Sequence, residues 1–198
     1  MSTMKSSFDV GQEGWCSYDY HGCIRAGRRL MVLTIWEPAG GSDGGGYIWT
    51  DEHGWSADTP EDPVSVLPFT LYRNWIGEGP LDLRGARVSV HLRGDDLQLF
   101  GADCHFWVVG SGDRGRWHYT SRPLKVSHGR WANEPNVFTL HNDEALWHRS
   151  WSRDPALPPS LDDLLGECHS YGFSFVGFDP VPRGRFCMDK LEITLANE

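Results

Sequence analysis

The chain has 198 residues, a net charge of −9 and a sequence pI of about 5.4. This acidity argues against nucleic acid as a partner, because phosphate binding needs a basic face. The N-terminal sequence has no apolar signal segment, and no run approaches the roughly 18 apolar residues of a membrane span. The sequence therefore predicts a cytoplasmic protein with no membrane contact, and its length predicts one domain, residues 1–198.

Tryptophan, glycine and cysteine are the informative residue types. The chain holds 10 Trp and 23 Gly, which is typical of a β protein that presents rings on its loops or sheet faces. The five cysteines are Cys16, Cys23, Cys104, Cys168 and Cys187. An odd number without a secretion signal predicts reduced, buried thiols. In an exported protein, Cys16 and Cys23 could instead form a disulfide.

Strand patterns dominate the chain from end to end. The segment 86–93 alternates apolar and polar residues, and Gly94-Asp95 predicts a hairpin to the next segment, 96–101. The predicted strands are 29–36, 68–75, 86–93, 96–101, 104–110, 116–121, 136–140, 171–178 and 186–196.

Helical signals are few. Ser160 is a candidate N-cap for a helix over 161–167, and 142–151 is a candidate for a second short turn of helix. The stretches 37–46 and 52–67 have the composition of long loops. The pattern predicts an all-β fold, a two-sheet antiparallel jelly-roll β-sandwich with one or two short helices.

Two longer stretches carry a family resemblance. "LDLRGARVSVHLRGDDLQL" (81–99) and "YGFSFVGFDPVPRGRFCMDKLEI" (171–193) resemble the galactose-binding-domain-like jelly rolls, which include several carbohydrate-binding modules and the complex I intermediate-associated proteins. The resemblance implies a binding module. It also implies a structural calcium ion that ties the N-terminal strand to the final strand, with Asp9 and Asp189 as ligands.

The strand alternation selects a candidate basic face. If Val88, Val90 and Leu92 lie in the core, their neighbours on the strand point outward, and the same holds around Trp117 and Tyr119. We expect a concave face that binds a carbohydrate or a related polar or anionic ligand, because sugar rings stack on aromatic rings and Arg recognises anions and hydroxyls. The alternative is an ordinary solvated face. The candidate residues are Arg73, Trp75, His91, Arg93, Arg116 and His118.

The stretch "GGGYIWTDEHGW" places an acid and an imidazole among aromatic rings at a spacing of two. It predicts a strand over 47–50 in which Tyr47 or Trp49 lies in the core. Asp51, His53 and Trp55 would follow at the mouth of the sandwich, where loop residues contact ligands. Trp55 could instead plug the end of the sandwich.

Two other functions remain open. The first is an enzyme on the same fold, a sugar-derivative hydrolase or lyase that uses His118 or His53 as its acid–base group, and these residues with Asp51, His141 or His148 could also ligate a metal. No H-E-x-x-H or G-x-S-x-G motif supports it. The second is an assembly module that binds a protein partner through a Trp-rich surface.

Overall fold

The computed structural model describes residues 2–17, 34–57, 63–110, 115–152, 154 and 156–196, and among them it forms two sheets packed face to face. The first sheet runs in the order β10-β6-β13-β3-β2, and β1 and β9 pair with β13 and β6. Its strands are β1 (Thr3–Ser6), β2 (Ile35–Glu37), β3 (Tyr47–Asp51), β6 (Arg87–Gln98), β9 (Ser127–His128), β10 (Asn136–Thr139) and β13 (Arg183–Thr194).

The second sheet runs in the order β11-β8-β7-β12-β5-β4. All its pairings are antiparallel, whereas the first sheet has one parallel pairing, between β6 and β9. Its strands are β4 (Ser56–Ala57), β5 (Ser65–Tyr72), β7 (Asp103–Gly110), β8 (Gly115–Leu124), β11 (Trp147–Ser152) and β12 (Cys168–Val176). The predicted all-β, two-sheet sandwich is confirmed.

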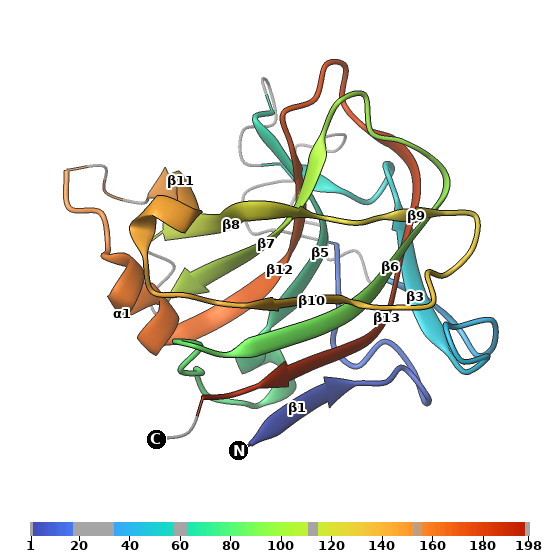
Figure 1. Ribbon diagram of the computed structural model, residues 1–198, viewed down its shortest axis with the longest axis horizontal. Helices are drawn as coiled ribbons and strands as arrows, with labels where there is room; N and C mark the ends of the chain where they lie inside the picture. The colour runs from blue at the N-terminus through green and yellow to red at the C-terminus, as the bar shows by residue number, and fades with distance from the viewer. Residues whose placement is uncertain are drawn as a thin grey trace.

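The core lies between the two sheets, where the inward residues of each strand meet. The predicted inward sets on β6 and β8 are correct, because Val88 and Val90 are fully buried and Trp117 and Tyr119 are nearly so. Aromatic edge-to-face contacts such as Phe106–Phe173 fill the space between the sheets. Figure 1 shows the two chain ends side by side where β1 pairs with β13.

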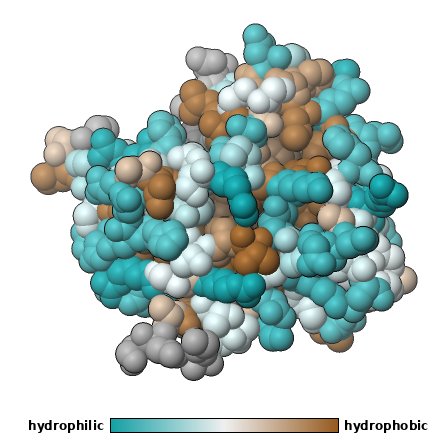
Figure 2. Space-filling view, viewed as in Figure 1, coloured by the Kyte–Doolittle hydropathy of each residue, from teal (hydrophilic) through white to brown (hydrophobic). Residues whose placement is uncertain are grey.

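Helices are short and lie at the edges of the sandwich. The helix α1 (Leu161–Gly166) begins as predicted, with Ser160 Oγ accepting a hydrogen bond from the Asp163 N–H at 3.1 Å. Two 3-10 turns, η1 (Arg73–Ile76) and η2 (Glu144–Leu146), complete the described set. None of the described helices is long and apolar enough to cross a membrane. Figure 2 shows one face of the molecule, mostly polar with apolar groups in the middle and at the upper right.

The predicted hairpin at Gly94-Asp95 is wrong. The strand β6 continues through these residues to Gln98, because Gly94 and Asp95 pair with Phe186 and Arg185 on β13. The chain turns later, at Phe100 and Gly101, which both have positive φ, and it then crosses to the second sheet. The pairing register shifts just after the Gly-Asp pair, between Asp95 and Gln98, where Asp96 has a positive φ.

Two other element predictions need correction, and a third is described only in part. The segment 142–151 is helical only over Glu144–Leu146, and Trp147 then begins β11, because its ring packs on Tyr119 of β8 in the core. The predicted loop 52–67 contains β4 and the start of β5. Of the strand predicted over 29–36, the described part forms β2 from Ile35, whereas 29–33 lie outside the described residues, as does Cys23.

Candidate functional site

The outer face of the first sheet carries two aromatic side chains on β3. Ile48 is fully buried toward the core, so its neighbours Tyr47 and Trp49 point to the other side of the strand. The two-residue spacing of the sequence thus becomes a row of rings on one sheet face. Tyr47 is buried, as predicted for one of these rings, but on the outer face of the sheet, because Ile48 and Thr50 occupy the core side of this short strand.

Arg93 on β6 organises the middle of this face. Its guanidinium lies 4.4 Å from the centroid of the Trp131 ring and 4.8 Å from that of Tyr47. The two rings meet edge-to-face at 5.6 Å, and the Trp131 Nε1–H donates to the carbonyl of Gly40 at 2.7 Å. Cation–π contacts of this kind hold a cation and its rings in a fixed arrangement. Arg93 therefore fixes Trp131, which comes from the loop before β10, beside Tyr47.

The charge of Arg93 is balanced within the same cluster. Its Nη2 donates to Asp95 Oδ2 at 2.9 Å, and Cys187 on β13 lies 3.7 Å away. Burial opposes the charge on Arg93, but Cys187, Tyr47 and Asp95 outweigh it, and the pKa of Arg93 is raised. Burial also raises the pKa of the Cys187 thiol to about 12, so this thiol is neutral at pH 7.

A second cation–π contact lies next to the Arg93 cluster. The Arg185 guanidinium sits 3.7 Å from the centroid of the Trp49 ring, and Trp49 Nε1 donates to Glu37 Oε1 at 3.1 Å. We call Tyr47, Trp49, Arg93, Trp131 and Arg185 the aromatic face. Tyr47 and Arg93 are almost fully buried within it, whereas Trp49, Trp131 and Arg185 keep part of their surface in solvent.

A groove of about 770 Å³ borders the aromatic face at Trp131. The loop between β8 and β10 forms one side of it and is firmly attached. Ser127 Oγ donates to the Leu92 carbonyl at 3.0 Å, and the Gly129 N–H donates to the Gly94 carbonyl at 2.8 Å. The groove is lined by His91, Leu92, Lys125, Val126, Ser127, His128, Arg130, Trp131, Ala132, Asn133, Glu134, Pro135 and Asn136.

Asp189 and the glycine-rich loop before β3 bear on the calcium expectation. Asp189 is fully buried. Its Oδ2 accepts from the Ser42 N–H and hydroxyl at 2.6 and 2.7 Å, while its Oδ1 has no hydrogen-bond partner among the described residues. A Cβ added at Gly41 would meet Asp189 Oδ2 and the carbonyl oxygens of Gly45 and Gly46, all within 2.9 Å. Converging oxygens of this type suit a hard cation.

Asp9 also lies against this loop, within 3.6 Å of a Cβ added at Gly45. Asp9 and Asp189, the two predicted calcium ligands, therefore both lie against the glycine-rich loop before β3. Lys190 already supplies one positive charge there. It forms an ion pair with Asp43, and this bond raises the pKa of Lys190, with smaller contributions from Asp189 and Asp9.

The expected convergence of the basic residues is wrong. Arg93 and His91 lie on the outer face of the first sheet, whereas Arg116 and His118 point outward from β8 in the second sheet. The alternation correctly gave each residue's side of its strand, but it cannot say which sheet a strand joins. One concave face therefore cannot hold both sets.

His118 is built into the protein rather than presented to a ligand. The ring is fully buried, Nδ1 is 2.7 Å from Ser174 Oγ and Nε2 is 2.8 Å from Ser150 Oγ. Burial lowers the pKa of His118 well below its ordinary value, and the charge of Arg116 adds to the effect. Arg116 itself is buried with its guanidinium 4.9 Å from the Trp107 ring centroid. His118 therefore cannot exchange protons with a ligand in solvent in this arrangement.

Arg73 and Trp75 lie on η1, away from both groups. Arg73 is buried, pairs with Glu78 at 2.7 Å and donates to the Gly79 carbonyl, so it anchors its own turn. Trp75 is 41% exposed, and its ring packs at a tilt against that of Tyr72, with centroids 4.3 Å apart.

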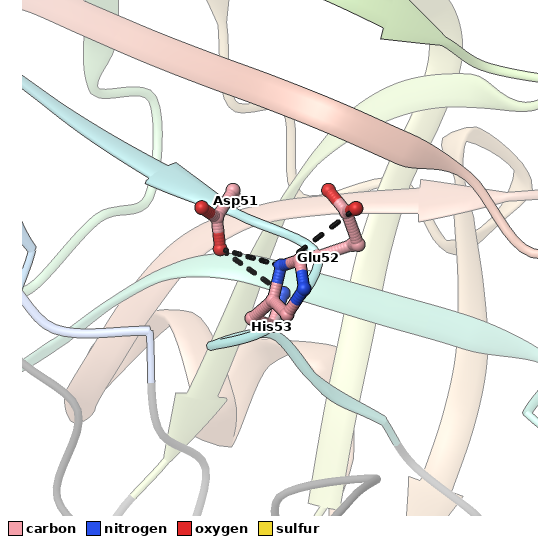
Figure 3. Close-up of side chains that lie close together, drawn as sticks. All are labelled: Asp51, Glu52 and His53. Carbon is pink, nitrogen blue, oxygen red and sulfur yellow. Dashed lines mark hydrogen bonds and ion pairs between the residues drawn. The ribbon is translucent and has the colours of Figure 1, made fainter.

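The residues predicted at the end of β3 divide into one buried tryptophan and a group near the surface. Trp55 is 1% exposed and packs edge-on against Phe175, so it plugs the end of the sandwich. Asp51, Glu52 and His53 stay near the surface, and Figure 3 shows the imidazole between the two carboxylates. His53 Nδ1 lies 3.4 Å from Asp51 Oδ1 and 3.7 Å from Glu52 Oε1. Among the described residues, they form the one group of three metal-capable side chains whose ligand atoms lie within 4.8 Å of one another.

Several residues of the aromatic face were missed from the sequence. Tyr47 and Trp49 carried a usable signal, because they alternate with Asp51 in an extended segment. Trp131 and Arg185 carried none. Trp131 lies in a loop without periodicity, and Arg185 pairs with β3 only through the strand order of the folded sheet.

Comparisons with known proteins concern the fold. No family model matches the chain, and no curated protein matches it. A solved structure with a similar fold is the family 11 carbohydrate-binding module from Clostridium thermocellum in complex with a β-1,3-1,4-mixed-linked tetrasaccharide. It is 13% identical over 99% of this chain and 97% of that chain, with a TM-score of 0.55. The L4b domain of human laminin α-2 is 8% identical over 99% and 98%, with a TM-score of 0.50. The resemblance to the carbohydrate-binding jelly rolls is therefore confirmed as a likeness of fold.

Proposed function

We propose that the protein binds carbohydrate noncovalently on the aromatic face and in the adjoining groove. The observation that carries the proposal is the set of part-exposed rings, Trp49 and Trp131, held on one sheet face by Arg185 and Arg93. Sugar rings have apolar C–H faces that pack on such rings, and their hydroxyls need hydrogen-bonding groups nearby.

The polar groups around the rings suit this use. Asp51, Glu37 and Arg185 lie on the same outer face as Trp49, and Asn133 and Asn136 line the groove beside Trp131. The groove volume of about 770 Å³ falls within the range of small-molecule sites, roughly 300–1,000 Å³. A structural neighbour with this fold was solved with a tetrasaccharide, which is consistent with the proposal.

Affinity electrophoresis and calorimetry against a panel of soluble neutral and acidic polysaccharides test this function. We expect Trp49→Ala and Trp131→Ala each to weaken binding at least about tenfold, since a stacked ring at a site centre contributes over about 1.4 kcal/mol. Trp75→Ala is the matched control, because Trp75 is an exposed tryptophan on η1. If Trp49→Ala and Trp131→Ala bind with the same affinity as the Trp75→Ala control, the assignment of binding to the aromatic face is contradicted.

We also propose that a calcium ion stabilises the junction between the N-terminal segment, the Gly40–Gly46 loop and β13. Asp9, Asp189 and the loop carbonyls would supply oxygen ligands, and the unpaired Oδ1 of Asp189 is the atom that most needs a partner. The ion would add positive charge among carboxylates, where Lys190 now neutralises Asp43. Its role would be structural.

A further inference from the structure

The groove beside Trp131 carries a charge opposite to that of the protein. The chain has a net charge of −9. The groove, however, is lined by Lys125 and Arg130 with one acid, Glu134, and its other ionisable residues are His91 and His128. A local excess of cations on an acidic protein attracts anionic ligands to that place.

The two permanent cations of the groove are not neutralised by neighbours. Among the described residues, neither Lys125 nor Arg130 has an acid within ion-pairing distance, and both are exposed. Arg93 differs, because Asp95 already balances it at 2.9 Å. Lys125 and Arg130 therefore keep their donors for a ligand.

The position of these cations relative to Trp131 indicates the kind of anion. Arg130 precedes Trp131 in the chain, and Lys125 lies at the other end of the same loop. That end is fixed, because the Lys125 N–H donates to Asn136 Oδ1 at 2.7 Å and Asn136 Nδ2 donates back to the Lys125 carbonyl at 2.9 Å. A ligand in the groove thus meets an aromatic ring and two cations together.

We propose that the groove selects acidic saccharides, those whose sugar rings carry carboxylates, as in uronic acids. This inference rests on the proposed carbohydrate binding. The sugar ring packs on Trp131, and its carboxylate accepts hydrogen bonds from the Arg130 guanidinium, which matches carboxylate geometry, and from the Lys125 ammonium. A neutral sugar uses the ring but leaves both cations without a partner.

Calorimetry with paired oligosaccharides tests the inference. The probes are uronate oligosaccharides from pectate, alginate and oxidised cellulose, each compared with its carboxyl-reduced, neutral form, together with a mixed-linkage β-glucan. We expect at least one acidic form to bind about tenfold more tightly than its reduced partner, because charge-assisted bonds to a carboxylate are lost on reduction. Added salt should shrink this difference.

Matched variants assign the preference to the groove. Lys125→Ala and Arg130→Ala should each reduce the acidic-to-neutral ratio several-fold, while Lys5→Ala, which removes the same charge from β1, should leave it unchanged. A ratio near one in the wild type would overturn the inference and leave carbohydrate binding standing. A ratio that survives in both groove variants would overturn it too. Failure of the folded protein to bind any saccharide would overturn both proposals.

Discussion

The guanidinium of Arg93 lies 4.4 Å from the ring centroid of Trp131, joining a β6 residue to a loop residue 38 positions later in the chain. The contact holds Trp131 next to Tyr47, at the border between the aromatic face and the groove. The strand alternation predicts that Arg93 points into solvent and contacts ligand directly. The structure gives it a supporting position, because it is only 9% exposed beneath the rings.

Arg93→Ala should therefore lower both stability and ligand affinity. The free energy of unfolding should fall by about 1–3 kcal/mol, because Asp95 and Tyr47 lose a buried charged partner. Arg87→Ala, an exposed arginine on the same strand, is the control. Chemical denaturation of the two variants measures the difference. Equal stabilities would mean that the Arg93 cluster contributes nothing to the fold.

The buried His118 predicts a loss of stability in acid. Its folded-state pKa is depressed below the ordinary value of 6.5 by burial, so the unfolded chain takes up the proton first. The stabilising contribution is complete above about pH 6.5 and is lost as the pH falls below that value, at about 1.4 kcal/mol per pH unit for one proton.

Denaturant unfolding at pH 7.5 and 5.5 measures this effect. His118→Asn should flatten the pH dependence relative to the wild type, whereas His128→Asn, at an exposed position, should not. Parallel pH profiles for the wild type and His118→Asn would exclude His118 as the source.

Gly172 on β12 tests the packing of the second sheet. A Cβ at this position would lie 1.9 Å from the Phe69 carbonyl oxygen and 2.9 Å from the Trp107 ring. Gly172→Ala should destabilise the protein by about 1–3 kcal/mol or more, because backbone must move to admit the methyl group. Gly79→Ala is the control, since nothing lies within 4 Å of its Cβ. Thermal melts of both variants check the prediction, and equal melting temperatures would contradict the strand arrangement.

Calcium should raise the melting temperature of the wild type, and chelation should lower it, because an ion that binds only the native state stabilises by mass action. Asp189→Ala alone is not decisive, since Asp189 also accepts two hydrogen bonds from Ser42. The informative comparison is the calcium response, which Asp189→Asn should abolish and Asp51→Asn should leave intact. If neither calcium nor chelator changes the melting temperature of the wild type, the proposed calcium site does not exist.

The sequence predicts which segments form strands better than it predicts which strands pair with one another. Alternation around Val88 and Val90 gave the inward face of β6, because burial on one side of a sheet imposes a period of two. Whether β6 and β8 share a sheet depends on long-range pairing, which leaves no local pattern. For that reason the alternation predicts Arg93 and Arg116 on one face, whereas the structure has them on two. Trp131 could not be predicted for a different reason, since it lies in a loop and a loop has no periodicity.

The most direct test of carbohydrate binding on the aromatic face is a titration followed by NMR of the tryptophan indole N–H signals. The protein is assigned through single Trp→Phe variants and titrated with whichever oligosaccharide binds in calorimetry. We predict that the signals of Trp49 and Trp131 shift in proportion to occupancy, while those of Trp75 on η1 and the buried Trp55 stay in place. Shifts at Trp75 with no change at Trp49 or Trp131 would place the ligand on another surface and contradict the account.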